Sequence, residues 1–371
     1  MNRITIFSAA LIIGLSACKK DKEDVPTPEV KKNDIPEFYQ ESSEANWGKT
    51  APEIVKISES SSRISDPTDL DFNPTRPGEL WIVNQGTEGT GGSTVMVTGL
   101  NSSSPSYDYR KDQNSWHFMS LPTGIAFGDN GNFATSTGVL DANHNGGTFT
   151  GPALWSSDLN VYARPSGGNG SHLDMLHASP YSMGIAWETG NAYWVMDGYH
   201  GNICRYDFVN DHGPGNSDHD DGRVRRYTNV KVKKNLNIPS HMEFDHANNN
   251  LYAVDNGNNR VLKIEVSTQS KIGNLTLINE QLAEYSEMNA DFKVISSNAL
   301  TSYCGLAMNG NRIFLSDYET GTIICLNSEN TYEIGRIETG IKGITGIVVD
   351  ANNVLWFVSN ETDALYKVVS K

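Results

Sequence analysis

Imidazole and phenol side chains recur at the expected turns of this sequence, and such groups bind metal ions and polar ligands. His144, His177, His200 and His241 could supply nitrogen ligands to a transition metal such as zinc, because neutral imidazole is a common ligand of that ion. Tyr199 directly precedes His200 and could act as a general base beside such a metal. Taken singly, each histidine is more often an ordinary surface or hydrogen-bonded residue, so the zinc interpretation requires that they converge.

A second chemical cluster is the acidic segment 207–222, which holds five Asp and two His in 16 residues. Its carboxylates indicate a calcium site with Asp211, Asp218, Asp220 and Asp221 as candidate ligands, whereas its histidines would favour a transition metal. The spacing is not that of an EF-hand, because Asp221 stands at the position of the turn glycine. A solvated loop interrupted by Gly and Pro is an equally good interpretation.

A repeated sequence phrase must position these groups. It consists of a turn residue, a short apolar strand, a polar turn, a second strand that ends in Asp, Asn or Ser, and a third strand. The copies start 41 to 62 residues apart, against about 40–50 for a four-stranded propeller blade. They start at Pro67, Pro122, Pro180, Met242, Cys304 and Thr345. The sequence therefore predicts an all-β, six-bladed β-propeller with four-stranded blades over residues 51–371.

The sixth repeat has sequence for only three strands before Lys371. The segment Glu53–Ile57, which precedes the first repeat, could supply the fourth strand and so close the ring.

Propeller topology also assigns the candidate residues to faces. The loops that enter each first strand and those that join the second strand to the third lie at one mouth of the central channel, together with the blade-two insertion 137–152 that carries His144. The acidic segment falls on the opposite face, so a single site that unites it with the histidines would require this loop to be long enough to wrap around the rim. For each Asp-x-Gly turn the alternative is structural, because Asp accepts backbone hydrogen bonds there. The predicted ligand-binding residues at the mouth are Asn84, Tyr181, Asp197, His200, His241, Asp255, Tyr303, Asp317 and Asn360.

Three segments carry a resemblance to known propellers. The stretch Leu251–Val261 resembles an NHL repeat, and Ala192–Asp197 is similar to the repeat of lipoprotein-receptor propellers. Val195–Tyr199 resembles a segment of the peptidyl-hydroxyglycine amidating lyases, which are six-bladed NHL propellers. That resemblance implies Tyr199 as the base and a zinc held by three His that each follow the Pro opening a blade. The zinc positions are not matched, since Thr123, Tyr181 and Ser240 follow Pro122, Pro180 and Pro239.

The N-terminal residues predict export from the cytoplasm. Residues 1–17 read as a signal peptide, because their apolar run is too short to span a bilayer. Leu15–Cys18 resembles a bacterial lipobox, which implies that Cys18 is lipidated and anchors the protein in a membrane. Lys19 then favours the outer membrane, with the protein facing the periplasm or the cell surface. We expect residues 18–50, rich in Pro and charge, to form a flexible tether.

Charge and cysteine content exclude some classes of function. The formal net charge is −15, and an acidic surface repels nucleic-acid backbones. Besides Cys18 the chain has Cys204, Cys304 and Cys325, which fall on first or third strands that are not neighbours in a blade. We therefore expect three buried thiols and no structural disulfide.

The favoured interpretation is a binding module whose polar mouth takes a small molecule, glycan, peptide or protein partner. The alternative is a metal-dependent lyase or hydrolase with His200, His241 and His144 or His177 as ligands and Tyr199 as base. A scaffold role without a ligand is a third possibility. Whether the protein is an enzyme, and whether it holds calcium or zinc, stays open from sequence alone.

Overall fold

The computed structural model describes residues 35–38, 52–164, 168–216, 218–235, 237–276 and 280–369. The predicted signal peptide 1–17 and the predicted lipidation site Cys18 lie outside them. No helix in the described ranges is long and apolar enough to cross a membrane.

Strands dominate the described chain, as expected from its β-branched and aromatic repeats. They form four sheets of four strands and one sheet of eight. Blades one and two contain β2 (Pro67–Phe72), β3 (Leu80–Thr87), β4 (Gly91–Thr98) and β5 (Ser106–Arg110), then β6 (Pro122–Phe127), β7 (Asn132–Thr137), β8 (Ala153–Ser156) and β9 (His172–Met175). Blades three and four contain β10 (Ser182–Thr189), β11 (Ala192–Asp197), β12 (Asn202–Asp207) and β13 (Arg223–Tyr227), then β14 (Met242–Asp245), β15 (Asn250–Asp255), β16 (Arg260–Asn274) and β17 (Glu284–Ser297).

The last two blades complete the ring. They contain β18 (Tyr303–Asn309), β19 (Arg312–Asp317), β20 (Thr322–Asn327) and β21 (Glu333–Glu338), then β22 (Ile344–Val349), β23 (Leu355–Ser359), β24 (Ala364–Val369) and β1 (Glu53–Lys56). The helical segments are short: α1 (Ser115–Phe118) and the 3₁₀ turns η1 (Pro36–Phe38), η2 (Ser60–Ser62) and η3 (Asn256–Asn258). The predicted all-β propeller is thereby confirmed, with six four-stranded units in the described residues.

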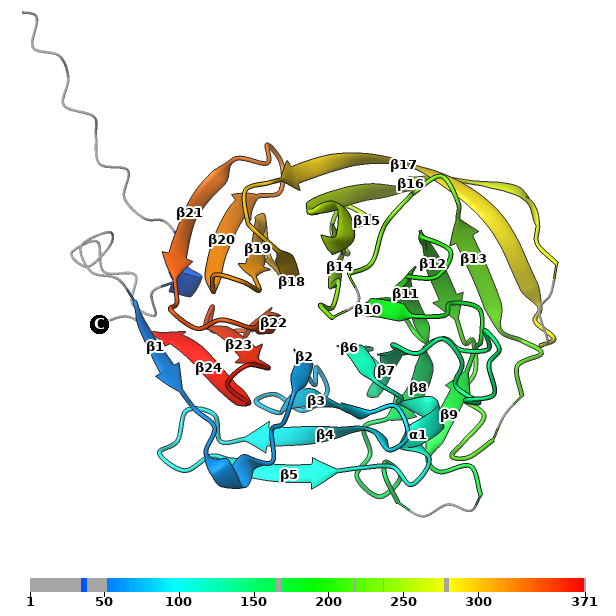
Figure 1. Cartoon of the computed structure of the whole chain (residues 1–371), viewed down its shortest axis with the longest axis horizontal. Helices are drawn as coiled ribbons and strands as arrows, with labels where there is room; N and C mark the ends of the chain where they lie inside the picture. Colours follow the sequence, from blue (N-terminus) through cyan, green and yellow to red (C-terminus); the bar gives the residue numbers. More distant parts are fainter. Residues whose placement is uncertain are drawn as a thin grey trace, which may run out of the picture. The chain divides into compact units, whose positions relative to one another are not determined.

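The ring closes in the way predicted from the sequence. The innermost strands β2, β6, β10, β14, β18 and β22 contact one another in a closed cycle around the centre (Figure 1). Strand β1 pairs antiparallel with β24, Glu53 opposite Val369 and Lys56 opposite Tyr366. The segment that precedes the first repeat therefore supplies the fourth strand of the sixth blade and protects its edge.

Glycines on the inner strands let the strands approach closely. A Cβ atom on Gly184 of β10 would lie 2.0 Å from the carbonyl oxygen of Ser240, and one on Gly346 of β22 would lie 2.7 Å from Cα of Asp69. Gly184 also has a positive φ of 59°, which a residue with a side chain rarely adopts. The glycine in the repeated phrase thus allows a narrow channel.

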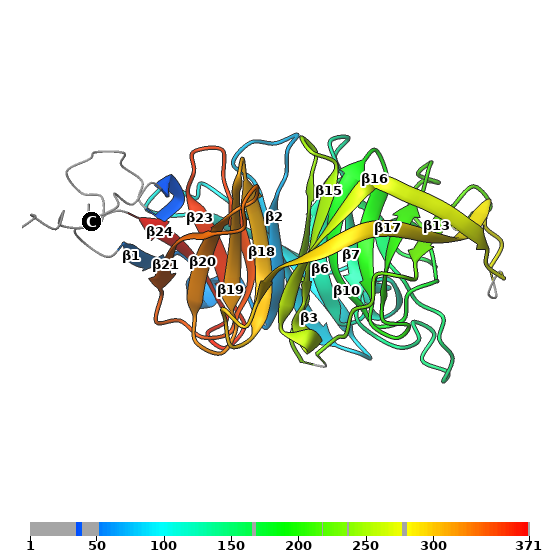
Figure 2. The same ribbon diagram turned by 90° about the horizontal axis from the view of Figure 1, so that it is seen from above.

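One feature was not predicted: blades three and four are joined into a single sheet of eight strands. Strand β17 pairs parallel with β13 over Glu284–Met288, and antiparallel with β16 from Ser286 to Ser297. Figure 2 shows β16 and β17 running as a pair along the outside of the ring toward β13. The β16–β17 hairpin therefore extends beyond blade four and pairs with the outermost strand of blade three.

The core lies between neighbouring blades, where each blade buries apolar side chains against the next. Trp81 of blade one, for example, packs with its ring centroid 5.6 Å from Phe127 and 5.1 Å from Phe133 of blade two. Cys204, Cys304 and Cys325 are buried, as predicted.

Four residues of the predicted tether are described, and three of them, Ile35, Glu37 and Phe38, are buried against the propeller. Ile35 and Phe38 join the apolar cluster of blades five and six. Glu37 accepts hydrogen bonds from the Arg312 guanidinium, the shortest with 2.6 Å between Nη2 and Oε1. This part of the segment 18–50 is therefore held by burial and an ion pair.

Candidate functional site

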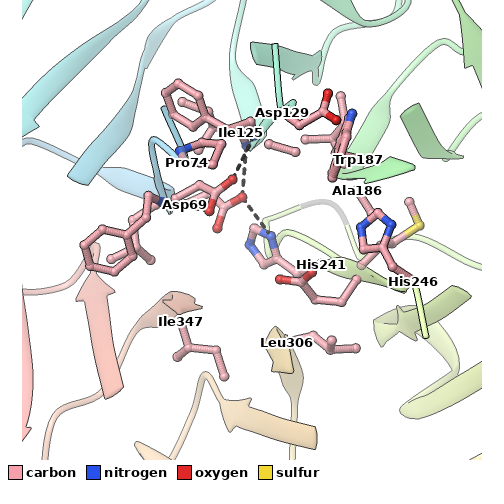
Figure 3. A pocket seen from close by; sticks show the side chains of 18 residues that line it. Asp69, Pro74, Ile125, Asp129, Ala186, Trp187, His241, His246, Leu306 and Ile347 are labelled. Atoms are coloured by element: carbon pink, nitrogen blue, oxygen red, sulfur yellow. Dashed lines mark hydrogen bonds and ion pairs between the residues drawn. The ribbon is translucent and has the colours of Figure 1, made fainter. Parts of the chain in front are cut away.

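The centre of the ring encloses a cavity of about 240 Å³ to which all six inner strands contribute (Figure 3). Its apolar wall includes Ile125, Ile185, Leu306 and Ile347, one from each of four inner strands. The lining side chains that carry a carboxyl group or an imidazole are Asp69, Asp71, Asp129, His241, Glu243 and His246. An enclosed apolar cavity with a few polar groups is the usual form of a small-molecule site.

Alternation along β2 places two carboxylates toward the cavity. Leu70 is buried in the core between blades, so its neighbours Asp69 and Asp71 take the other face of the strand. Asp69 Oδ2 accepts the N–H of Ile125 at 2.9 Å, and Asp71 Oδ2 accepts the N–H of Phe127 at 2.8 Å. The two carboxylates thereby satisfy backbone donors of β6, which forms no strand ladder with β2.

His241 spans the channel. Strands β2 and β14 lie three positions apart in the cycle of six inner strands, on opposite sides of the ring. His241, immediately before β14, nevertheless places Nδ1 3.3 Å from Asp69 Oδ2 and Nε2 3.1 Å from the carbonyl oxygen of Thr68 (Figure 3). Both ring nitrogens are therefore engaged with β2, and this contact forms a bar across the channel at one end of the cavity.

The cavity changes the protonation of two carboxyl groups. Burial raises the pKa of Asp71 to about 7. The hydrogen bond from the Phe127 N–H lowers this pKa, and the negative charge of Asp69 raises it further. Burial, together with the charges of Asp71 and Asp69, raises the pKa of Glu243 well above its usual range. Both shifts favour the protonated form, in which a carboxyl group can donate a hydrogen bond as well as accept one.

An aromatic pair borders the polar groups. Trp187 and His246 both line the cavity, with ring centroids 4.8 Å apart. The Trp187 indole N–H donates to the carbonyl oxygen of Gly190 at 3.0 Å, which fixes the ring. Burial lowers the pKa of His246, which favours its neutral form.

The cavity and the predicted mouth lie toward opposite ends of the channel. Tyr199 donates its N–H to the carbonyl oxygen of Pro180, just before β10, whereas Trp187 lies five residues along that strand. At about 3.3 Å per residue this is roughly 16 Å. His241, which immediately precedes β14, borders the cavity at the end nearer the predicted mouth, whereas Tyr181, Tyr199 and His200 are not among the residues that line it.

Three aspartates predicted at the mouth are buried and accept backbone N–H groups. Asp197 accepts the N–H groups of Tyr199 and His200 in its own turn at 2.9 and 2.8 Å, and its other oxygen lies 2.6 Å from Arg226 Nη1. Asp317 accepts the N–H of Glu319 in its own turn at 3.0 Å, whereas Asp255 accepts the N–H of Lys233, in the segment that precedes its blade, at 2.7 Å. These hydrogen bonds correspond to the structural alternative that the sequence analysis gave for the Asp residues of the turns.

The other predicted mouth residues are spread around the ring. Asn84 is buried between Arg63 and Ser93. Tyr303 is buried, with its hydroxyl 2.5 Å from Ser296 Oγ. The Tyr181 ring lies 3.4 Å from Lys234 Nζ, Tyr199 is 54% exposed, and Asn360 is half-buried in the turn after β23.

The predicted metal ligands separate in the same way. His144 contacts Glu88 and the carbonyl oxygen of Trp116, and His200 Nδ1 lies 2.7 Å from Asp197. Within the described ranges, two groups of side chains lie close enough together to hold an ion: His177 with His219 and Glu280, and Asp174 with His212 and Asp221. Asp211, Asp218 and Asp220 are exposed and belong to neither group, nor do His144, His200 and His241.

The cavity carboxylates Asp69, Asp71 and Glu243 were not among the sequence candidates. A signal was present, because Pro67–Phe72 and Met242–Asp245 carry acidic residues on innermost strands, where the other blades have apolar or small residues. A carboxylate on such a strand must face either the core or the channel, and only the channel tolerates it.

No family model matches the chain, and no curated protein matches it. Solved structures do resemble it. An auxiliary nutrient binding protein from Bacteroides thetaiotaomicron aligns at 10% identity over 87% of this chain and 78% of its own, with a TM-score of 0.55. One from Bacteroides ovatus aligns at 11% over 85% and 76%, with a TM-score of 0.54. The calcium-binding protein regucalcin from Agrobacterium tumefaciens aligns at 11% over 84% and 92%, with a TM-score of 0.50. These likenesses concern the fold, and support the β-propeller.

Proposed function

We propose that this protein is a binding module that takes a small, hydroxyl-rich ligand, such as one sugar unit, into the cavity of its channel. The observation that carries the proposal is that Asp69, Asp71 and Glu243 line one cavity, where burial favours protonation of Asp71 and Glu243 and so pairs hydrogen-bond donors with acceptors. Each sugar hydroxyl both donates and accepts hydrogen bonds, so this pairing satisfies it, while Trp187 offers an apolar face.

The fold neighbours support this choice of function class. Two of them are named auxiliary nutrient binding proteins, and a sugar is a nutrient. The acidic surface of this chain is compatible with a neutral ligand held by hydrogen bonds.

We further propose that the binding module is a lipoprotein of the NHL-propeller type, anchored through Cys18 in the outer membrane. The support is the resemblance of Leu15–Cys18 to a lipobox and of Leu251–Val261 to an NHL repeat. Fractionation of the producing cells should recover the protein with outer membranes. Cys18→Ala should release it from them, and an unchanged distribution would contradict the anchor.

The ligand proposal is tested by calorimetric titration of the full chain with monosaccharides such as glucose and galactose, and with ethanolamine as a small cation. We expect a monosaccharide to bind and Glu243→Leu to weaken its affinity at least tenfold, about 1.4 kcal/mol, because the apolar side chain can neither donate nor accept a hydrogen bond. Tyr332→Ala is the control, because the Tyr332 side chain is 75% exposed and does not line the cavity.

Two results would overturn the proposal in different ways. Binding of ethanolamine but of no sugar would identify a cation site, whose affinity should rise with pH as Asp71 and Glu243 lose their protons. Sugar binding that survives Glu243→Leu but is lost in Tyr199→Ala would move the site to the predicted mouth.

A further inference from the structure

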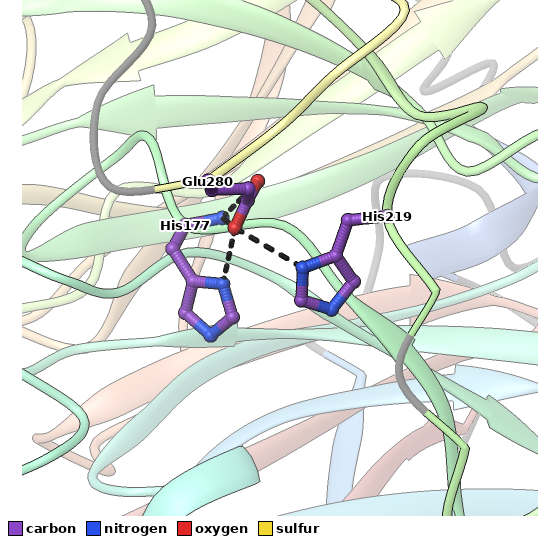
Figure 4. Close-up of side chains that lie close together, drawn as sticks. All are labelled: His177, His219 and Glu280. Atoms are coloured by element: carbon purple, nitrogen blue, oxygen red, sulfur yellow. Dashed lines mark hydrogen bonds and ion pairs between the residues drawn. The ribbon is translucent and has the colours of Figure 1, made fainter.

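The cluster of His177, His219 and Glu280 brings together three segments that are far apart in the sequence (Figure 4). His177 follows β9 of blade two, His219 lies in the loop between β12 and β13 of blade three, and Glu280 lies on the connection that follows β16 of blade four. The cluster is at the outer part of the ring, because β9 and β13 are the outermost strands of their blades.

The three side chains already meet at one point. Glu280 Oε2 lies 2.6 Å from His177 Nδ1 and 3.4 Å from His219 Nδ1. Tetrahedral coordination with bonds of about 2.0–2.1 Å places neighbouring ligand atoms roughly 3.3 Å apart. A zinc ion would therefore require small adjustments, the largest being a slight separation of His177 from Glu280.

Burial fixes the ligands before any ion arrives. The side chains of His177 and Glu280 are 4% and 2% exposed. The His177 ring stacks on Phe149 with centroids 3.7 Å apart. The backbone N–H of His177 donates to both carboxylate oxygens of Glu280 at 3.2 Å. The Glu280 carboxylate is thus aimed at the imidazole.

Polar atoms around the cluster lack the hydrogen bonds that burial normally demands. His177 Nε2, His219 Nε2 and Asp174 Oδ2 are buried and have no hydrogen-bond partner, and the Asp174 side chain is fully buried. Such atoms are costly in a protein interior. The cluster therefore has hydrogen-bonding or ligating capacity that its own side chains do not use.

Asp174 is placed to orient one ligand. Its Oδ1 lies 3.6 Å from His219 Nε2, on the side of the ring opposite the Nδ1 that faces Glu280. Carboxylates in this position commonly accept the second N–H of a metal-bound imidazole and fix its tautomer. His212 and Asp221, which lie close to Asp174, form a further layer behind it.

We propose that His177, His219 and Glu280 bind one zinc ion, with Asp174 as a positioning residue for His219. Two imidazole nitrogens with one carboxylate favour zinc over calcium, which prefers six or more oxygen ligands. Because the ligands come from three blades, the ion clamps the loop 208–222 and the β16–β17 hairpin onto the end of blade two. This site lies outside the channel and is independent of the proposed ligand cavity.

The experiment uses the full chain, stripped of metal with a chelator and titrated with zinc alone. Plasma mass spectrometry after gel filtration should find one zinc per chain, and zinc should raise the midpoint of thermal unfolding. Glu280→Gln and His219→Ala should each weaken zinc binding at least tenfold and remove most of that shift. His219 lies on a partly exposed loop, so its loss should not prevent folding, which far-UV circular dichroism checks.

Asp218→Asn is the matched control, because it removes an exposed carboxylate from the same loop without touching the cluster. It should leave zinc binding unchanged. A second readout is cobalt substitution, which should give the intense visible absorption of tetrahedral Co²⁺ and lose it in Glu280→Gln. The proposal is overturned if the chain binds no zinc, if both cluster variants retain it, or if Asp218→Asn abolishes it.

Discussion

Arg226 offers a sharp test of how the turn at Asp197 is held. The guanidinium and the carboxylate are 5% and 0% exposed, with 2.6 Å between Nη1 and Oδ2. Nη1 also donates to Asn202 Oδ1 at 2.7 Å, and Nη2 donates to the carbonyl oxygen of Ala178. Arg226→Ala would leave the Asp197 charge buried beside two acceptors that lose their donor.

The expected cost follows from that geometry. Breaking a buried ion pair by removing one partner costs about 3–5 kcal/mol of unfolding free energy. Asp197 keeps the N–H groups of Tyr199 and His200, so we expect a value near the lower end of that range. Arg336→Ala is the control, because Arg336 makes an equally short bidentate pair with Glu333 but is 45% exposed. It should cost less than about 1 kcal/mol.

Urea unfolding followed by tryptophan fluorescence measures both variants against the unchanged chain. Asp197→Asn combined with Arg226→Ala should recover part of the loss, since the unpaired charge is gone. If Arg226→Ala costs no more than Arg336→Ala, the buried pair does not hold the turn, and Asp197 becomes free to serve as the ligand-binding residue predicted from sequence.

Three further predictions concern the cavity, the N-terminal segment and the thiols. Asp71 binds a proton more tightly in the folded chain, so its contribution to stability falls as pH rises from 3.8 to about 7. Asp71→Asn should flatten that part of the stability profile, and an unchanged slope would contradict the raised pKa. Glu37→Ala should cost about 1–3 kcal/mol in urea unfolding, because Arg312 loses charged hydrogen bonds; no loss would mean that the segment is not held there. Cys204 and Cys304 are fully buried, and burial raises the pKa of Cys204 to about 11, so both should react with a thiol reagent only after unfolding.

The fold could be predicted from sequence because its signals are local and repeated. Each copy of the phrase defines one strand pair and its turns, and the six copies coincide with β2, β6, β10, β14, β18 and β22. The missing strand of the last blade could be predicted as well, because an unpaired edge requires a partner and Glu53–Ile57 was a free strand-like segment. The joined sheet of blades three and four could not, since the pairing of β17 with β13 depends on where a long hairpin bends.

The channel chemistry was only partly predictable, because a residue's face depends on strand register. His241 was expected at the mouth, yet it reaches across the ring to Asp69 and Thr68. That contact depends on the narrow channel, which the glycine of the repeated phrase allows, and on a pairing between opposite blades that no local pattern encodes.

The rim cluster shows the limit of assigning loops to faces by topology. That assignment placed His177 and the acidic segment on opposite faces, and it is correct only for loops that stay at the end of their own blade. The segment 208–222 instead runs along the outermost strand of blade two: His212 and Gly215 donate their N–H groups to the carbonyl oxygens of Leu173 and His172. His219 therefore reaches His177 because a loop longer than a turn satisfies its backbone on the exposed edge of β9. An edge strand followed by a long loop in the next blade is the sequence signal by which such a contact could be anticipated.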